Sequence, residues 1–245
     1  MKQLTILSLL AGVLFIAAAY PDGNMILKKV DANMTAKTTV SESQMVVYGR
    51  RETRTITSKS YAEGNDNAFT DYLSPERDKG TKMLKLGDRL WTYSPSSDRT
   101  IQISGHLLRQ SVMGSDLSYE DMMEKRTLED MYNSKVIGED TLHGRKVWIL
   151  QLDAKVEDVA YVKRKMWVDQ ERFIPLQEEL FAKSGELLKK MVMSDVTKIG
   201  NRWYPKKTNY KDMLKDGKGT DFIITSVQFD VPIPEYIFSK ASLKK

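Results

Sequence analysis

Apolar and polar positions alternate with a period of two along most of the chain from about residue 41 onward. This alternation predicts β-strands, because successive side chains of a strand point to opposite faces of the sheet. Turn signals rich in Gly, Pro, Asn and Asp recur about every 8–14 residues, which is typical of an antiparallel meander, sandwich or barrel. The predicted strands cover residues 44–48, 53–62, 68–73, 82–86, 89–93, 99–104, 132–138, 145–153, 160–168, 173–181, 187–198, 202–212 and 219–230.

One helix is predicted ahead of the strands. Either Asp22 or Asn24 can cap it, because both side chains accept a hydrogen bond from a backbone N–H that lacks a helical partner. The apolar positions that follow at helical spacing are Ile26, Leu27, Val30 and Met34. A single stripe of this kind indicates a helix that packs one face on a sheet.

Residues 105–130 interrupt the strand pattern. Ser118 and Asp121 have the spacing of a capping box, and Ser115 and Asp116 are rival caps. We expect Asp116 to cap a helix that begins near Leu117. The apolar residues of the segment are Leu107, Leu108, Val112, Met113, Leu117, Met122 and Met123. Methionine is flexible and polarisable, so it suits both adaptable ligand surfaces and irregular gaps in a core.

Apolar side chains occupy both faces of the predicted strand at 145–153. Leu150 and Leu152 point to one face, and Val147 and Ile149 point to the other. A sheet with water on one side alternates more cleanly between apolar and polar residues. We therefore expect the N-terminal helix and the interrupting segment to cover the second face of the sheet.

The first 19 residues have the pattern of a secretory signal peptide. Lys2 is the charged region, residues 4–16 form the apolar region, and small residues end at Ala19. An uncleaved anchor is the alternative, but the apolar run is shorter than the roughly 20 residues that span a bilayer. We predict cleavage after Ala19 and a periplasmic protein, with residues 20–245 forming a single domain. The chain has no cysteine, so it has neither a lipid-attachment cysteine nor disulfides.

Charge and motifs exclude several functions. The formal net charge is +5, and the basic residues are spread along the chain, so we expect no nucleic-acid binding. Motifs of α/β-hydrolases, nucleotide-binding loops and zinc proteases are absent. His106 and His143 are the two histidines, and adjacent carboxylates on a strand point to opposite faces. We expect no catalytic residue, metal or cofactor, although a single-histidine triad and a cross-strand carboxylate pair stay open at this point.

Four stretches carry a resemblance to a known family. They are YLSPERDKGTKMLKLGDRLWTYSPSSDRTIQI, SVMGSDLSYEDM, RKMWVDQERFIPLQEELFAKSGELLKKMVM and GNRWYPKK. With the signal peptide and the short helix before them, they resemble the bacterial outer-membrane lipoprotein-sorting protein family of the LolA-like superfamily. The resemblance implies a mainly β (α+β) fold, an open curved antiparallel half-barrel with short helices covering its concave face. The arginines that latch the helical lid of the well-studied carrier have no counterparts that we can number here, so none is carried over.

The resemblance also implies a function. Carriers of this superfamily shelter acyl chains of lipids or lipoproteins while crossing the periplasm. We therefore expect a monomeric carrier whose partners are such chains, with an inner-membrane transporter and an outer-membrane acceptor as candidate partners. The candidate ligand contacts are Leu107, Leu108, Met113, Met122 and Met123, with Trp91 and Trp148 as weaker candidates. A lipid hydrolase acting in the same cavity and a transporter accessory without cargo are the alternatives.

Overall fold

The computed structural model describes residues 20–49 and 52–244, so the predicted signal peptide lies outside the described residues. Within this part, 13 strands form one sheet in the order β6-β5-β4-β3-β2-β1-β13-β12-β11-β10-β9-β8-β7. Strands that follow each other in the chain are neighbours, except that β1 pairs with β13 and that β6 and β7 are the two edges. The strands are β1 (Thr38–Tyr48), β2 (Thr53–Glu63), β3 (Asn67–Ser74), β4 (Lys82–Leu86), β5 (Arg89–Ser94), β6 (Arg99–Ile103), β7 (Tyr132–Leu142), β8 (Arg145–Ala154), β9 (Lys163–Asp169), β10 (Pro175–Phe181), β11 (Leu187–Ile199), β12 (Arg202–Asp212) and β13 (Thr220–Phe229).

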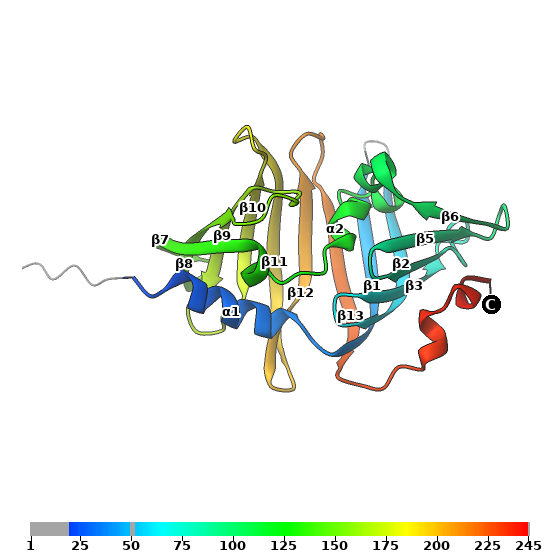
Figure 1. Cartoon of the computed structure of the whole chain (residues 1–245), viewed down its shortest axis with the longest axis horizontal. Coiled ribbons are helices and arrows are strands. Elements are labelled where there is room, and N and C mark those ends of the chain that lie inside the picture. Colours follow the sequence, from blue (N-terminus) through cyan, green and yellow to red (C-terminus); the bar gives the residue numbers. More distant parts are fainter. Residues whose placement is uncertain (1–19, 50–51, 245) are drawn as a thin grey trace, which may run out of the picture.

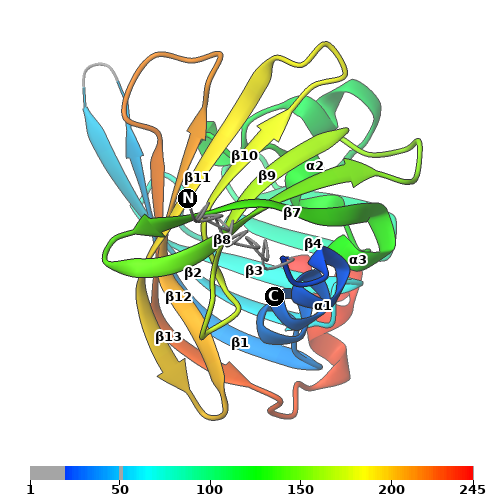
Figure 2. The same cartoon turned by 90° about the vertical axis from the view of Figure 1, so that its left-hand side faces the viewer.

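The sheet is open, because within the described residues neither β6 nor β7 pairs with a further strand. It is strongly curved, and the chain that joins the two edge strands passes over its concave side (Figures 1 and 2). We call this connection, residues 105–131, the central segment. It contains the 3₁₀ helices η1 (Gly105–Arg109) and η2 (Val112–Gly114) and the short helices α2 (Tyr119–Met123) and α3 (Leu128–Met131). The predicted fold, an open antiparallel half-barrel with few short helices, is confirmed.

Helix α1 (Gly23–Met34) contacts β7, β12 and α3. Asp22 caps it, as predicted, by accepting a hydrogen bond from the backbone N–H of Asn24 at 2.9 Å. The Asn24 side chain instead accepts a 2.8 Å hydrogen bond from the backbone N–H of Ser134, and thereby satisfies a donor of edge strand β7. A Cβ on Gly23 would lie 2.6 Å from the carbonyl oxygen of Ser134, so this close approach of helix and strand requires glycine.

The apolar stripe of α1 forms a core with strands β7 to β9. Ile26, Leu27 and Val30 are buried together with Leu150 and other residues of the concave face. Met34 is 36% exposed, so the prediction that the buried stripe extends to this residue was wrong. The physical reason is that Met34 is the last residue of the helix and lies beyond this core, at the margin of a cavity.

The opposite faces of the sheet contain separate cores. In β4, Met83 joins the concave-side core that includes Val112 of the central segment. Its neighbour Leu84 points to the other face and packs with Leu243. Leu243 belongs to the 3₁₀ helix η4 (Lys240–Lys244). Together with η3 (Glu235–Phe238), this C-terminal helix contacts β3 to β5. Both α1 and the central segment thus cover the concave face, and the C-terminal segment covers part of the outer face.

Candidate functional site

A cavity of about 830 Å³ lies between the central segment and the concave faces of β9 to β12. Its walls combine apolar, aromatic and charged side chains. The apolar lining includes Met122 and Met123 from α2, Leu180 from β10 and Met191 from β11. Its volume lies in the range of 300–1,000 Å³ that is typical of small-molecule sites, although nine of its 20 lining residues are charged.

Two largely buried cations flank a leucine on the floor of this cavity. Arg164 on β9 and Lys189 on β11 are the direct cross-strand partners of Leu180 on the strand between them. Directly opposed residues point to the same face, and adjacent strands are about 4.8 Å apart, so the two backbones are separated by about 10 Å. Only 16% of the Arg164 side chain and 12% of the Lys189 side chain are exposed.

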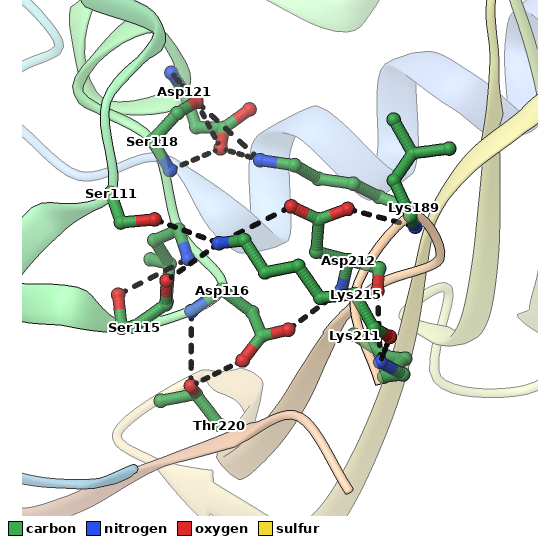
Figure 3. A network of polar contacts seen from close by, with 12 residues as sticks. Ser111, Ser115, Asp116, Ser118, Asp121, Lys189, Lys211, Asp212, Lys215 and Thr220 are labelled. Carbon is green, nitrogen blue, oxygen red and sulfur yellow. Dashed lines mark hydrogen bonds and ion pairs between the residues drawn. The ribbon is translucent and has the colours of Figure 1, made fainter. Parts of the chain in front are cut away.

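The carboxylate of Asp121, on α2, reaches from the central segment to this floor. It forms an ion pair with Lys189 and accepts a 2.6 Å hydrogen bond from the Tyr161 hydroxyl (Figure 3 shows the lysine contact). Ser118 adds two donors, its backbone N–H at 2.9 Å and its hydroxyl at 2.7 Å. The predicted capping box of Ser118 and Asp121 is therefore confirmed, and the same carboxylate also joins the central segment to the sheet.

Opposing effects set the ionisation of this carboxylate. Burial pushes the pKa of Asp121 upward, but the charge of Lys189 and the hydrogen bonds from Lys189, Tyr161 and Ser118 outweigh it. The pKa of Asp121 therefore lies below its ordinary value, and the group is a carboxylate at neutral pH. Burial and the neighbouring Asp121 charge raise the pKa of Tyr161, so its hydroxyl keeps the proton that it donates.

A chain of polar contacts continues from Tyr161 to Arg164. The Tyr132 hydroxyl donates a 2.7 Å hydrogen bond to the carbonyl oxygen of Tyr161, and Arg164 Nε donates to the Tyr132 hydroxyl at 3.1 Å. Arg164 Nη1 lies 3.4 Å from the Glu178 carboxylate, and its guanidinium lies 5.6 Å from the centre of the Tyr161 ring. Burial raises the pKa of Glu178 despite the opposing charge of Arg164.

The turn between α2 and α3 binds both halves of the sheet. On one side Lys125 forms a 2.8 Å ion pair with Asp88 in the turn between β4 and β5. On the other side Arg126 forms a 2.8 Å ion pair with Asp158 in the loop between β8 and β9. Lys85 on β4 donates to the carbonyl oxygens of Met122 and Glu124, at 3.1 and 3.4 Å. Polar contacts of side chains thus hold this turn in place over the cavity.

Asp116 has a different role from the predicted one. Its carboxylate accepts hydrogen bonds from the Asp212 backbone N–H at 3.0 Å and from the Thr220 hydroxyl at 2.8 Å (Figure 3). The Asp116 N–H donates to the same hydroxyl at 3.0 Å. The prediction that Asp116 caps a helix near Leu117 was wrong, because the helix begins later with Ser118 as its cap. Asp116 instead anchors the middle of the central segment, between η2 and α2, to β12 and β13.

A second cavity, of about 260 Å³, lies beside the first. Three residues line both cavities: Arg126, Met191 and Tyr210. The second cavity extends along α1, whose Val30 and Asp31 line it together with Met193 of β11. The hollow side of the sheet therefore extends from α2 to the end of α1.

The predicted contact residues lie in three different places. Met122 and Met123 line the large cavity. Leu107, Leu108 and Met113 pack against the core of the first half of the sheet, where Arg54 also donates a hydrogen bond to the Met113 carbonyl oxygen. The two tryptophans lie apart from them. Trp91 is on the outer face with Leu243, and Trp148 lies below α1 with its ring centre 5.7 Å from that of Phe173.

The sequence pattern was not used to predict the charged cavity floor formed by Arg164 and Lys189, although the alternation of residues along the strands indicates it. The run Lys163-Arg164-Lys165 has the composition of a solvated surface. The period of two, however, places Arg164 on the same face as Met166, which is buried. Lys189 likewise shares a face with Met191 and Met193. Within the described residues no group of three or more His, Cys, Asp or Glu is placed to hold a metal ion.

Comparison with known proteins agrees with this architecture. A family model described as "Uncharacterized protein" matches residues 64–245. None of the curated proteins matches the chain. Among the described residues, no helix is both long enough and apolar enough to cross a bilayer.

Three solved structures are similar over nearly the whole chain. A DUF1329 family protein from Desulfovibrio piger is 23% identical with a TM-score of 0.80, covering 90% of this chain and 97% of its own. The domain of a proposed outer membrane lipoprotein-sorting protein from Vibrio parahaemolyticus is 20% identical with a TM-score of 0.78, covering 91% and 98%. A LolA superfamily protein from Nitrosomonas europaea is 21% identical with a TM-score of 0.73, covering 91% and 100%. The chain therefore belongs to the family whose model matches residues 64–245, and its fold is that of the LolA-like outer-membrane lipoprotein-sorting proteins.

Proposed function

We propose that this protein is a periplasmic carrier that shelters the acyl chain of a lipid or lipoprotein and transfers it toward the outer membrane. The observation that carries the proposal is the cavity of about 830 Å³ between the central segment and the curved sheet. An acyl chain exposed to water costs about 0.8 kcal/mol per methylene group. A cavity with methionines in its wall relieves this cost for chains of different shape.

The central segment acts as the lid of this carrier. Met122 and Met123 contact the cargo directly, because they line the cavity. Leu107, Leu108 and Met113 anchor the lid on the first half of the sheet and reach cargo only when the lid shifts. Trp91 and Trp148 support the walls from the outer face and from below α1.

The location and partners follow from the same proposal. Cleavage after Ala19 would release residues 20–245 as a single carrier domain in the periplasm. An inner-membrane transporter would load it, and an outer-membrane acceptor would receive the cargo. The hydrolase alternative lacks a histidine base at this site, because neither His106 nor His143 lines the large cavity.

Uptake of a fluorescent fatty acid by the purified full chain tests the proposal. Met191→Trp places a larger side chain where both cavities meet and should reduce uptake. Val192→Trp is the matched control, because the next residue of β11 points to the opposite face. Equal uptake by both variants, or no uptake by the unmodified protein, contradicts the carrier function.

A further inference from the structure

The donors that surround Asp121 form a site for an anionic group. Two of them, the Lys189 amine and the Tyr161 hydroxyl, belong to β11 and to the loop before β9. The other two belong to Ser118 and move with the central segment. If that segment left the sheet, Lys189 and Tyr161 would lose this acceptor and remain on the cavity wall. A buried cation without a partner is costly, so this wall favours another anion in the same place.

The distribution of charge around the cavity supports this reading. The sheet contributes the cations Arg164 and Lys189 to the lining. The carboxylates of the lining come from the central segment and the loops: Asp88, Glu120, Asp121, Glu124 and Asp158. Lys125 and Arg126 of the central segment form ion pairs with members of this second set. Glu178, the acid on the neighbouring part of the floor, pairs with Arg164 and lines the second cavity.

The volume limits the number of acyl chains. A methylene group is about the size of a water molecule, whose share of liquid volume is about 30 Å³. A cavity of about 830 Å³ therefore has room for somewhat fewer than 30 such groups. One long acyl chain with its head group fits within this limit while the central segment is in place. Two chains of 16 carbons, with about 32 such groups, already exceed it.

Resting on the carrier function proposed above, we infer that the cavity selects a single-chain amphiphile with an anionic head, and that this head takes the place of the Asp121 carboxylate on Lys189 and Tyr161. The Asp121 side chain is thus a built-in competitor of the ligand. Binding of the head releases α2 from the floor, while Asp116 keeps the part of the central segment just before α2 attached to β12 and β13. The carboxylate of a fatty acid and the phosphate of a lysophospholipid share the required chemistry.

Competition between the head group and Asp121 makes opposite predictions for the two members of one ion pair. Lys189→Met removes the cation for which the head and Asp121 compete, so it should abolish the preference for oleic acid over oleyl alcohol. Binding of oleyl alcohol, which has the same chain and no charge, should change by less than about twofold. Asp121→Asn removes the competitor and should raise the preference for oleic acid over oleyl alcohol. Lys190→Met, on the same strand but with its side chain on the other face, is the control and should leave both affinities unchanged.

The affinities are measured for the full chain by isothermal titration, with lysophosphatidic acid of the same chain length as a third ligand. Thermal unfolding of each variant confirms that it is folded, and Tyr161→Phe, which removes one donor only, replaces Lys189→Met if that variant does not fold.

Equal affinity of the unmodified protein for acid and alcohol overturns the inference but leaves the carrier function intact. A loss of acid preference in both Lys189→Met and Asp121→Asn also overturns it, because it indicates a purely structural ion pair. Binding of neither acid nor alcohol contradicts the carrier function and the inference together. Stronger binding of lysophosphatidic acid than of oleic acid assigns the head as a phosphate, and the reverse order assigns it as a carboxylate.

Discussion

Replacement of Lys189 by methionine should loosen the second half of the central segment without unfolding the sheet. Asp121 accepts from two donors outside the central segment, Lys189 and Tyr161, and the substitution removes the charged one. Methionine keeps the unbranched shape of the side chain on the cavity floor. Tyr161, Lys85 and Arg126 continue to hold α2 and the following turn.

The size of the effect follows from the lost contact. A hydrogen bond to a charged group contributes about 1.5–3 kcal/mol, and each 1.4 kcal/mol is a factor of ten in an equilibrium constant. Local opening of the central segment should therefore become about 10- to 100-fold more frequent. The core strands β8 to β10 do not depend on this contact and should keep their protection.

Hydrogen exchange followed by mass spectrometry measures this opening directly. Peptides that contain residues 117–124 should exchange about 10- to 100-fold faster in Lys189→Met than in the unmodified chain. The matched control Lys190→Met should exchange at the unmodified rate. Unchanged exchange of the central segment, or faster exchange of β8 to β10 together with it, would refute the view that this ion pair holds a separately moving segment.

Two further outcomes follow from the structure. The folded-state pKa of Asp121 lies below the ordinary value of about 3.9, so its contribution to stability is complete above that pH and is lost as the pH falls through the lower, folded-state pKa. The difference in unfolding free energy between the unmodified chain and Asp121→Asn, measured in urea, should be constant above about pH 5 and shrink below about pH 4; a difference that grows toward low pH would contradict this sign. Gly23→Ala should lower the unfolding free energy by about 1–3 kcal/mol, because its Cβ would meet the Ser134 carbonyl oxygen at 2.6 Å. An unchanged urea midpoint for that variant would show that α1 is not closely packed on β7.

The strands could be predicted because their alternation reports a local property. Each predicted strand corresponds to a strand of the structure, and the pair at 82–86 and 202–212 has the same bounds. Explicit turn residues such as Gly87-Asp88 and Gly200-Asn201 punctuate the pattern, so the pairing of β4 with β5 and of β11 with β12 follows from adjacency in the chain. The pairing of β1 with β13 does not follow in this way. The curvature and the open edges came with the resemblance to the LolA-like family, since alternation alone is compatible with a sandwich or a closed barrel.

The candidate site was only partly predictable because it depends on contacts between distant residues. Apolar composition marked residues 105–123 as a cover, yet Leu107 and Val112 pack solidly on the sheet and only the later part borders the cavity. Asp116 has the sequence of a helix cap, but Thr220, more than a hundred residues later, is its actual partner. The cationic floor required knowledge that Arg164 points to the concave side rather than to solvent.

The most direct test of the carrier function is the mass of the lipids that accompany the protein. The full chain is purified from its host without detergent, extracted with organic solvent and analysed by mass spectrometry beside the Met191→Trp variant. We predict that the unmodified protein contains a single-chain amphiphile in near-stoichiometric amount and that Met191→Trp contains much less. A protein that is free of lipid, or a lipid content that Met191→Trp does not lower, would contradict the proposal that the cavity between the central segment and the sheet holds an acyl chain.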